Sequence, residues 1–273
     1  MGRLAVVAAV GVAVWAFAQS GRGLHWRTLA PGIEFAMLRG EPYCRRGSSE
    51  IAVLRLDPAR VRLRVRHFTR EGEKTPPSIV GWQQRSGALA VFNAGQYYPD
   101  YSYMGLMVSD GEVVSSRVHP GFKAALVASP DDGTARARVI DLAHEPITAA
   151  HPGWREVAQS FMLFDRTGAR RVRTSDRVAN RTAVAEDDHG RIVVCTTEGG
   201  YTLSDFATLL KGARLGLGNA MSMDGGYEAE MCVVAGGFRY ASFGHWTADV
   251  TPDAPGSQVP LPAVIEVSAR GVK

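Results

Sequence analysis

The stretch Ala220-Met221-Ser222-Met223-Asp224-Gly225-Gly226 does most to decide how this chain folds. It is a short apolar run that ends in a carboxylate, and two glycines follow at once. We interpret it as a strand that delivers an acidic side chain to the edge of a sheet. The glycines there permit a sharp turn or the close approach of a ligand. Asp-Gly is also a common turn dipeptide, so a purely structural turn is the alternative.

Tight turns between apolar segments predict that most of the chain forms strands. Asp110-Gly111 is the strongest short-range hairpin signal, and the turns at 131–133 and 187–190 predict two further hairpins. Regular alternation of apolar and polar residues predicts two more strands before residue 70. The expected strands cover residues 50–57, 61–68, 88–93, 106–109, 112–115, 124–128, 135–140, 182–186, 191–196 and 263–268.

Helices are expected at only two places. Thr202-Leu203-Ser204-Asp205 fits a capping box, in which Asp205 reaches back to the first amides of the helix. Apolar residues then recur at helical spacing from Leu203 to Leu210. A short helix is predicted between Pro77 and Arg85. The predicted fold class is therefore α+β, with one mixed, mostly antiparallel sheet, hairpins and a few packed helices.

The first 20 residues have the composition of an export signal. Arg3 is followed by the unbroken apolar run Leu4–Phe17, and Ala16-Phe17-Ala18 is a small-x-small cleavage site before Gln19. The run is shorter than the roughly 20 residues that cross a bilayer. We expect a secreted or periplasmic protein, and an uncleaved single-pass anchor is the alternative. The membrane would then be contacted only through this segment.

Composition and charge narrow the classes of partner. The chain is 45% hydrophobic and 21% charged, which is ordinary for a globular core, and its net charge of +4 is mild. Its arginines are spread over the chain, which argues against nucleic acid as a partner. Arg62, Arg64 and Arg66 share one face of an alternating strand. This face is either solvated or a surface that attracts an anionic polymer.

The cysteines and histidines give no metal-binding pattern. The three cysteines are Cys44, Cys195 and Cys232, and no Cys-x-x-Cys or His-x-x-x-His spacing occurs, so no zinc site is predicted. Cys195 and Cys232 either pair in an oxidising compartment or serve as small buried hydrophobes. No cofactor is expected. A calcium or magnesium ion held by acidic oxygen ligands stays open.

Four short motifs occur in a fixed order. They are Phe92-Asn93-Ala94-Gly95, Arg181-Thr182-Ala183, Gly200-Tyr201-Thr202-Leu203 with Phe206-Ala207, and Met223-Asp224-Gly225-Gly226. From about Ala88 onward this pattern resembles the phosphodiester glycosidase family. Ala94 departs from it by replacing a glycine, and Tyr227-Glu228-Ala229 stands where the family has small residues. The expected parts are an export signal or anchor at 1–20, a strand-rich part at 21–87 and a phosphodiester-glycosidase-like domain at 88–273.

The resemblance implies catalytic roles for particular residues. When a phosphate ester is the leaving group, neutralising its charge matters more than donating a proton to it. The planar fork of an arginine meets two phosphate oxygens at once, and the resemblance implies this role for Arg181. The family counterpart of Asp224 lies in the site, so Asp224 is the first catalytic carboxylate. Glu198 is the second catalytic candidate, and Glu228 is the alternative partner.

Further residues are expected to contact the substrate. The amide of Asn93 can both donate to and accept from a sugar hydroxyl or a phosphate. The tyrosine-rich loop after Gln96 offers aromatic faces that suit sugar rings, or it simply covers the core. Gln159 and Ser160 resemble a Gln-Ser element of the family. The expected substrate-binding residues are Asn93, Gly95, Gln96, Gln159, Thr182, Gly225, Gly226 and Glu228. We expect Asn93, Arg181, Glu198 and Asp224 to converge in one cleft.

The expected function is an exported glycosidase. Its substrate would be a sugar phosphodiester or a glycosidic bond of an envelope polysaccharide or exopolysaccharide, so the expected partner is a carbohydrate or a sugar phosphate. The alternative is a non-catalytic protein on the same fold that binds carbohydrate or assists envelope or exopolysaccharide assembly. The departure at 227–229 favours this alternative.

Overall fold

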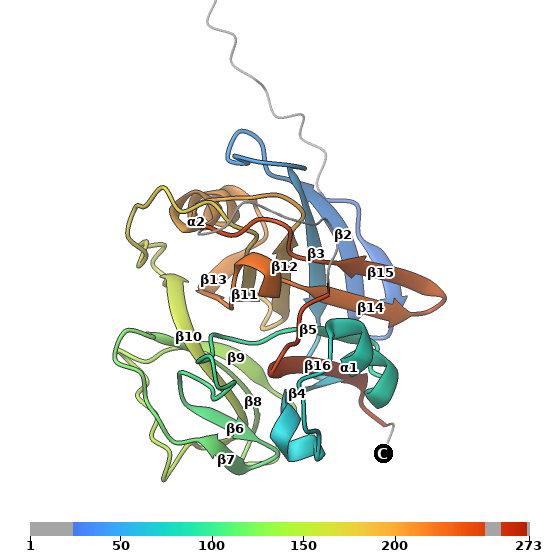
Figure 1. Ribbon diagram of the computed structural model, residues 1–273, viewed down its shortest axis with the longest axis vertical. Helices are drawn as coiled ribbons and strands as arrows, with labels where there is room; N and C mark the ends of the chain where they lie inside the picture. The colour runs from blue at the N-terminus through green and yellow to red at the C-terminus, as the bar shows by residue number, and fades with distance from the viewer. Residues whose placement is uncertain (1–23, 249–257, 272–273) are drawn as a thin grey trace, which may run out of the picture.

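The computed structural model describes residues 24–248 and 258–271, and it is dominated by β-strands (Figure 1). The expected export signal at residues 1–20 lies outside the described residues. Among those described, two α-helices occur, α1 (Ile79–Ser86) and α2 (Leu203–Gly212), together with the short 3-10 helices η1 (Phe68–Glu71) and η2 (Gly226–Glu228). Neither α-helix has the length and apolar character needed to cross a bilayer.

The strands form two sheets in which every recorded strand pair is antiparallel, whereas the sequence had predicted one mixed sheet. The larger sheet has the order β1 (Arg27–Ala30), β2 (Ile33–Arg39), β3 (Glu50–Leu56), β12 (Ile192–Thr197), β11 (Thr182–Asp187), β13 (Leu217–Ser222), β10 (Trp154–Phe164), β6 (Met107–Ser109) and β7 (Glu112–Ser115), with β8 (Ala124–Pro130) on β10 and β9 (Ala137–Asp141) on β8. The smaller sheet has the order β15 (Phe238–Ser242), β14 (Met231–Ala235), β5 (Ala90–Asn93), β16 (Ala263–Ala269) and β4 (Val61–His67).

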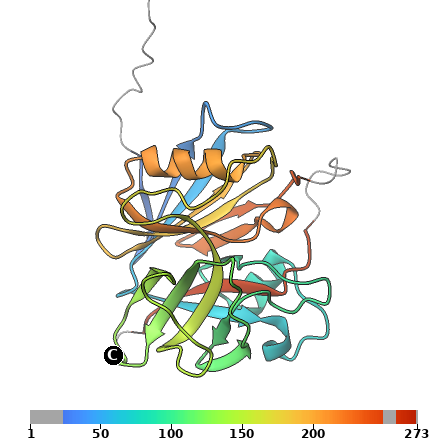
Figure 2. The same ribbon diagram turned by 90° about the vertical axis from the view of Figure 1, so that its left-hand side faces the viewer.

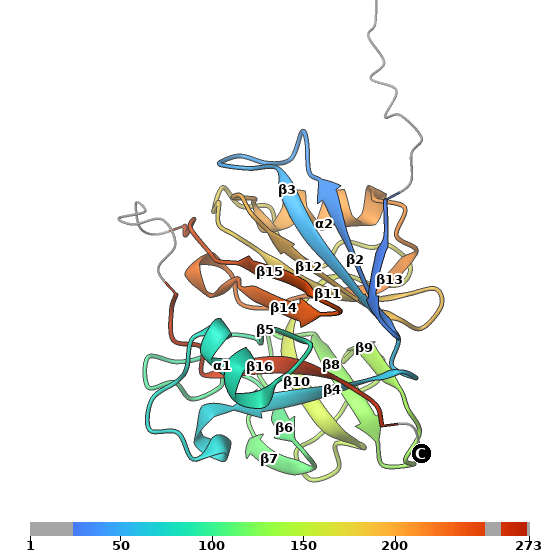
Figure 3. The same cartoon turned by 90° about the vertical axis from the view of Figure 1, so that its right-hand side faces the viewer.

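The main core lies between the two sheets. Alternate residues of the facing strands are fully buried there, such as Leu54 of β3, Val184 of β11 and Ile265 of β16. Helix α2 covers the outer face of the larger sheet (Figure 2), and α1 lies against the outer face of the smaller sheet (Figure 3). The strands β3 and β4 flank one turn in sequence but belong to different sheets, so the segment before residue 88 contributes to both.

Strand β10 connects two groups of strands. Its first part, from Trp154 to Ser160, pairs with β8, and its last part, from Phe161 to Phe164, pairs with β13 (Figure 1). The sequence did not predict this strand, because nine of its eleven residues are partly or fully buried and they alternate only weakly. A strand that is covered on both faces loses the period of two that marks a half-exposed strand.

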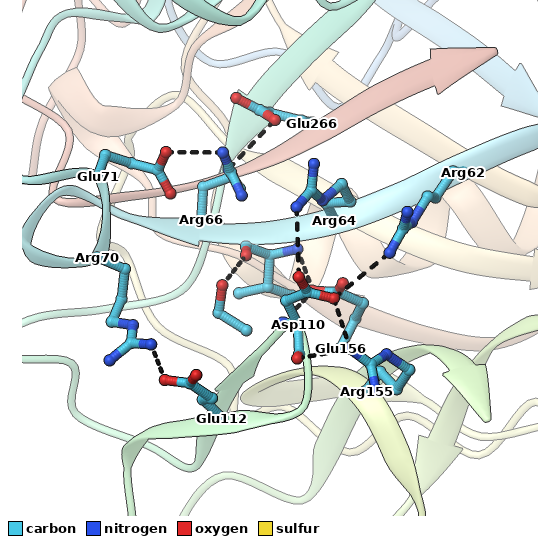
Figure 4. A network of polar contacts seen from close by, with 12 residues as sticks. Arg62, Arg64, Arg66, Arg70, Glu71, Asp110, Glu112, Arg155, Glu156 and Glu266 are labelled. Carbon is cyan, nitrogen blue, oxygen red and sulfur yellow. Dashed lines mark hydrogen bonds and ion pairs between the residues drawn. The ribbon is translucent and has the colours of Figure 1, made fainter. Parts of the chain in front are cut away.

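The arginine face of β4 carries ion pairs. Figure 4 shows Arg62, Arg64 and Arg155 around Asp110, at 3.5, 3.6 and 2.8 Å from its carboxylate oxygens. The next arginine of the face, Arg66, forms ion pairs with Glu71 of η1 and with Glu266 of β16. The side chains around Asp110 are partly exposed, so these pairs are solvent-screened contacts that contribute little to stability. Glu266, in contrast, is buried.

Helix α2 begins as predicted, but its cap differs in one contact. The Thr202 hydroxyl accepts a hydrogen bond from the Asp205 amide at 3.1 Å, which satisfies one free donor of the first turn. The Asp205 carboxylate does not reach back to the first amides. It forms an ion pair with Arg45 at 2.8 Å instead, which ties the helix start to the 40–49 loop.

Of the two alternatives that the sequence left open for Cys195 and Cys232, the structure excludes the disulfide. Both cysteines are buried and free, and they lie in different core clusters. Cys195 packs beneath α2 on the outer face of the larger sheet, while Cys232 packs beneath α1 on the outer face of the smaller one. The two sheets separate their sulfur atoms, so both serve as small buried hydrophobes.

Candidate functional site

The candidate site lies where strand ends from both sheets meet. The Met223 amide donates to the Thr182 carbonyl at 2.9 Å, which extends the pairing of β13 with the start of β11. One residue later, the Asp224 amide donates to the Ala94 carbonyl at 3.0 Å, just past the end of β5 in the other sheet. Asp224 therefore stands at the junction of the two sheets, where the predicted strand ends.

Asn93 holds this junction together through its side chain. Its Nδ2 donates to the carbonyl oxygens of Asp224 and Ala94 at 3.0 and 3.1 Å, and its Oδ1 accepts from the Glu230 amide at 3.3 Å. Because Asn93 is buried and both ends of its amide bond to backbone, it positions Asp224. These hydrogen bonds are made to the backbone, whereas the sequence led us to expect a direct contact between Asn93 and the substrate.

The side chain of Asn180, just before β11, also holds neighbouring backbone segments together. The sequence did not indicate it as a site residue. Its Oδ1 accepts from the amides of His245 and Trp246, and its Nδ2 donates to the Thr197 carbonyl at 2.6 Å. The Asn180 carbonyl accepts from the Gly226 amide at 2.9 Å. The only sequence signal for this role is its place directly before Arg181.

Arg181 is held by main-chain oxygens. Its Nε donates to the Tyr201 carbonyl at 3.0 Å and its Nη2 to the Arg177 carbonyl at 2.7 Å. Burial, with a smaller contribution from Arg177, lowers the pKa of Arg181 to about 10, so it remains a cation at neutral pH. No carboxylate within the described part of the chain forms an ion pair with it at 4.0 Å or less. The cation is thus fixed without being neutralised.

Gly225 leaves space beside this guanidinium. A Cβ at that position would lie 2.9 Å from the Asn180 carbonyl oxygen and 3.2 Å from Arg181 Nη1. Gly226 adopts φ +78°, a conformation that side chains disfavour, and it starts η2. The two glycines are thus required for different reasons. Gly225 leaves room for the Arg181 guanidinium, and Gly226 allows the backbone to turn.

Asp224 is a half-buried carboxyl with a strongly shifted pKa. Burial, followed by the charge of Glu228, raises its pKa to about 7. The Gly225 amide, which donates to Asp224 Oδ1 at 2.9 Å, and the nearby Arg181 offset part of this rise. A carboxyl with this pKa exchanges protons near neutral pH, as a catalytic acid or base requires.

Glu228 completes a small group of ionisable side chains. The Tyr97 hydroxyl donates to Glu228 Oε1 at 3.2 Å. Burial raises the pKa of Glu228, and the Tyr97 hydrogen bond offsets part of this rise. Burial also raises the pKa of Tyr97, with Glu228 and Asp224 adding to the shift. Tyr97 therefore remains a hydrogen-bond donor.

Glu230 is a further acidic residue next to this group, and the sequence did not indicate it as a site residue. Its main chain pairs with Asn93, and its side chain is fully buried. Neither carboxyl oxygen makes a hydrogen bond of ordinary geometry with any residue that the structure describes. Burial raises its pKa to about 8, which the amides of Val259 and Ile79 offset only in part.

The remaining expected residues divide into two groups. Gln96 lies at the site: its Nε2 donates to the Met223 carbonyl at 3.2 Å and its Oε1 accepts from Ser160. Gly95 lets the Tyr103 hydroxyl approach, since a Cβ there would stand 2.4 Å from that oxygen. Gln159 and Thr182 are fully buried inside the fold. Gln159 spends its whole amide on backbone groups, at Leu106, His119 and Phe122.

Glu198 does not join the Arg181–Asp224 group. Its neighbour Thr197 points toward Arg181, whose amide it binds at 2.9 Å. Adjacent residues of a strand point to opposite faces, and Glu198 instead accepts a hydrogen bond from the Tyr240 hydroxyl of β15. The structure thus brings Asn93, Arg181 and Asp224 together and leaves Glu198 apart.

No group of three or more histidine, cysteine, aspartate or glutamate side chains within residues 24–248 and 258–271 is arranged to hold a metal ion. The chemistry that the group can perform without one is that of a fixed cation beside two carboxyls with raised pKa values. This combination can bind an anionic ester and move a proton next to it.

The chain is similar to known proteins in its sequence profile and in its fold. The sequence profile of the phosphodiester glycosidase family matches residues 86–266. The fold is similar to the catalytic domain of zebrafish N-acetylglucosamine-1-phosphodiester alpha-N-acetylglucosaminidase, auto-inhibited by its pro-peptide, with a TM-score of 0.59 and 18% identity over 90% of this chain and 82% of that one. It is also similar to a hypothetical protein from Synechocystis, with a TM-score of 0.61 and 13% identity over 92% of this chain and 64% of that one. A comparison with curated protein sequences finds no significant match.

Proposed function

Because the chain belongs to the phosphodiester glycosidase family, we propose that it hydrolyses the glycosidic bond of a sugar phosphodiester or of an envelope polysaccharide. The composition of residues 1–20 supports export, and the substrate class follows the name of the family and of the zebrafish enzyme. Neither relative is similar enough in sequence to supply the sugar or the linkage.

The observation that carries the proposal is the position of Arg181 Nη1. Two donors of the guanidinium are spent on carbonyl oxygens, while Nη1 faces the space that Gly225 leaves. A phosphate ester placed there would meet a fixed, desolvated cation that no carboxylate of the described residues holds in an ion pair. Charge-assisted hydrogen bonds of this kind are about twice as strong as neutral ones.

In the proposed reaction Arg181 neutralises the departing phosphate, and Asp224 accepts the proton of the attacking water. The pKa of Asp224, raised to about 7, suits this role, because a base works best when its pKa is near the working pH. Glu228, oriented by Tyr97, lies beside Asp224 and contacts the sugar. Asn93 and Asn180 act through the backbone and keep the strand ends in place.

The test is hydrolysis of a panel of sugar-1-phosphodiesters and anionic glycans, followed through the release of new reducing ends. We expect turnover by the wild type and a loss of roughly a hundredfold or more in Asp224→Asn, the size typical of a lost general base. Arg181→Lys keeps the charge but loses the planar fork, so it should also be severely impaired. Arg239→Gln, on exposed β15, is the matched control. The absence of turnover across the panel would contradict the proposal.

The second candidate is a carbohydrate-binding protein without activity. The Tyr97–Glu228 contact favours this second candidate. Glu228 stands where the family has small residues, and it places a second acidic group beside Asp224. This candidate expects glycan binding that survives Asp224→Asn and no hydrolysis by the wild type. Turnover that disappears in Asp224→Asn would eliminate it.

A further inference from the structure

A polar cavity of about 320 Å³ lies outside the group around Asp224. It opens between the end of β4, the 97–103 loop and the end of β7. We propose that this cavity binds a sugar unit that carries an oxyanion, either a carboxylate or a phosphate. The side chains that make this chemistry are His67, Thr69, Ser102, Ser115, Ser116 and Arg117. Its volume is near the lower end of the roughly 300–1,000 Å³ range of small-molecule sites.

The direction of the hydrogen bonds at the cavity floor is fixed by His67. Its Nε2 lies 3.2 Å from the Tyr101 carbonyl, which can only accept, so Nε2 carries the proton. Burial lowers the pKa of His67, so the ring is neutral and Nδ1 is an acceptor. The Thr69 hydroxyl, 2.8 Å from Nδ1, must therefore donate to it. Thr69 is left with free lone pairs that accept from a ligand hydroxyl.

Ser102 is committed in the same way. Its hydroxyl lies 2.7 Å from Asp100 Oδ1, and a carboxylate can only accept, so the Ser102 proton points away from the cavity. Two rim hydroxyls thus present acceptors. A ligand that satisfies both needs several hydroxyl donors on a compact frame, which is the chemistry of a sugar ring.

Arg117 supplies the opposite chemistry. Its guanidinium lies 4.8 Å from the ring centre of Tyr98, and this contact restrains an otherwise exposed side chain. In the described ranges no carboxylate forms an ion pair with Arg117 and none of the residues that line the cavity is acidic; Asp100, behind Ser102, interacts with Arg117 only through its charge. This differs from the arginines around Asp110, which are already paired (Figure 4). An oxyanion on the sugar would complete the cavity.

The 97–103 loop separates this cavity from the candidate catalytic group. Tyr97 at its start binds Glu228, while Tyr103 at its end lines the cavity and donates its hydroxyl proton to the Gln159 carbonyl at 2.9 Å. One glycan could therefore reach both places around the loop. That the cavity is a subsite for the substrate of Asp224 rests on the proposed function, whereas the binding of an acidic sugar rests on the cavity alone.

The experiment measures binding of three free monosaccharides by calorimetry or by NMR titration: glucuronic acid, glucose 6-phosphate and glucose. None has a glycosidic bond, so hydrolysis does not enter the result. The variants are Arg117→Gln, Thr69→Val and Arg181→Lys, and Arg239→Gln is the control on the opposite edge of the smaller sheet. Arg117 is exposed, so its replacement leaves the core intact.

We expect at least one acidic sugar to bind roughly tenfold or more tightly than glucose, which is the size of one charge-assisted hydrogen bond. Arg117→Gln should remove this preference and Thr69→Val should weaken binding, while Arg239→Gln leaves both unchanged. The relative affinities of the two acids identify the oxyanion. Equal binding of glucose, loss of binding only in Arg181→Lys, or no saturable binding would each overturn the inference. Binding as expected without hydrolysis of any glycan would leave the cavity assigned and refute the proposed function.

Discussion

Replacing Glu230 with glutamine should stabilise the protein at alkaline pH and change it little in acid. The side chain is fully buried without an ordinary hydrogen bond, and its pKa is raised from 4.5 to about 8. A raised carboxyl pKa means that the folded state holds a proton that the unfolded state has lost. The stability from this group is therefore complete below pH 4.5 and is lost as the pH rises to 8.

The size of the effect follows from the shift. About 3.5 pKa units at 1.36 kcal/mol each give about 5 kcal/mol as the full loss between acid and pH 9. Because Glu228 is close and titrates with Glu230, we expect about 3 to 5 kcal/mol for the difference between wild type and Glu230→Gln at pH 9. At pH 5 the two proteins should agree within about 1 kcal/mol, because both side chains are then neutral.

Urea unfolding at pH 5, 7 and 9, followed by circular dichroism, measures this difference directly. Glu112→Gln is the matched control, since Glu112 is exposed and pairs only at the surface with Arg70. Its difference from wild type should stay below about 1 kcal/mol at each pH. If the stability of wild type and Glu230→Gln falls in parallel from pH 5 to 9, Glu230 is not the buried acid described above.

Three further predictions concern the site itself. The kcat/KM of the wild type should rise with pH through about 7, because only ionised Asp224 can accept a proton, and a flat profile between pH 5 and 9 would exclude that role. Gly225→Ala should reduce activity by roughly tenfold or more, because the new methyl group displaces the Arg181 guanidinium, whereas Gly212→Ala, at the open end of α2, should have full activity. Tyr97→Phe should raise the pKa of Glu228 further, since it removes the hydroxyl that stabilises the carboxylate, and a carbon-detected NMR titration that shows no rise would contradict the Tyr97–Glu228 hydrogen bond.

The elements that the sequence predicted well are those with local signals. The Asp110-Gly111 turn has positive φ at both residues, as its hairpin requires, and Thr202 caps α2. The sequence could not predict that β3 and β4 enter different sheets, because two apolar segments on either side of a short turn predict strands but not their partners. β3 pairs with β12 and β4 with β16, each more than 130 residues away, and local periodicity does not encode such partners.

The candidate site shows the same division. The motif residues Arg181 and Asp224 lie at strand ends that meet. For Asp224 the signal is the pair of glycines that follows an apolar run. The role of Asn93 as a brace could not be predicted, because an amide that bonds to backbone has the same sequence signature as one that binds a ligand. The sequence could not predict that Glu198 binds Tyr240 and lies apart from Asp224, because a shift of one residue along a strand reverses the face on which a side chain lies.

The position of β16 has a consequence for how the chain is made. It is the last strand among the described residues, and it lies between β5 and β4 in the interior of the smaller sheet. Its residue Val264 pairs directly with Asn93. Until residues 263–269 have left the ribosome, β5 lacks one neighbour, and the asparagine that braces Asp224 lies on an open sheet edge. Contacts of such long range form late in folding. A nascent or truncated chain that lacks this strand would therefore lack the proposed activity, which could begin only after residues 263–269 have emerged.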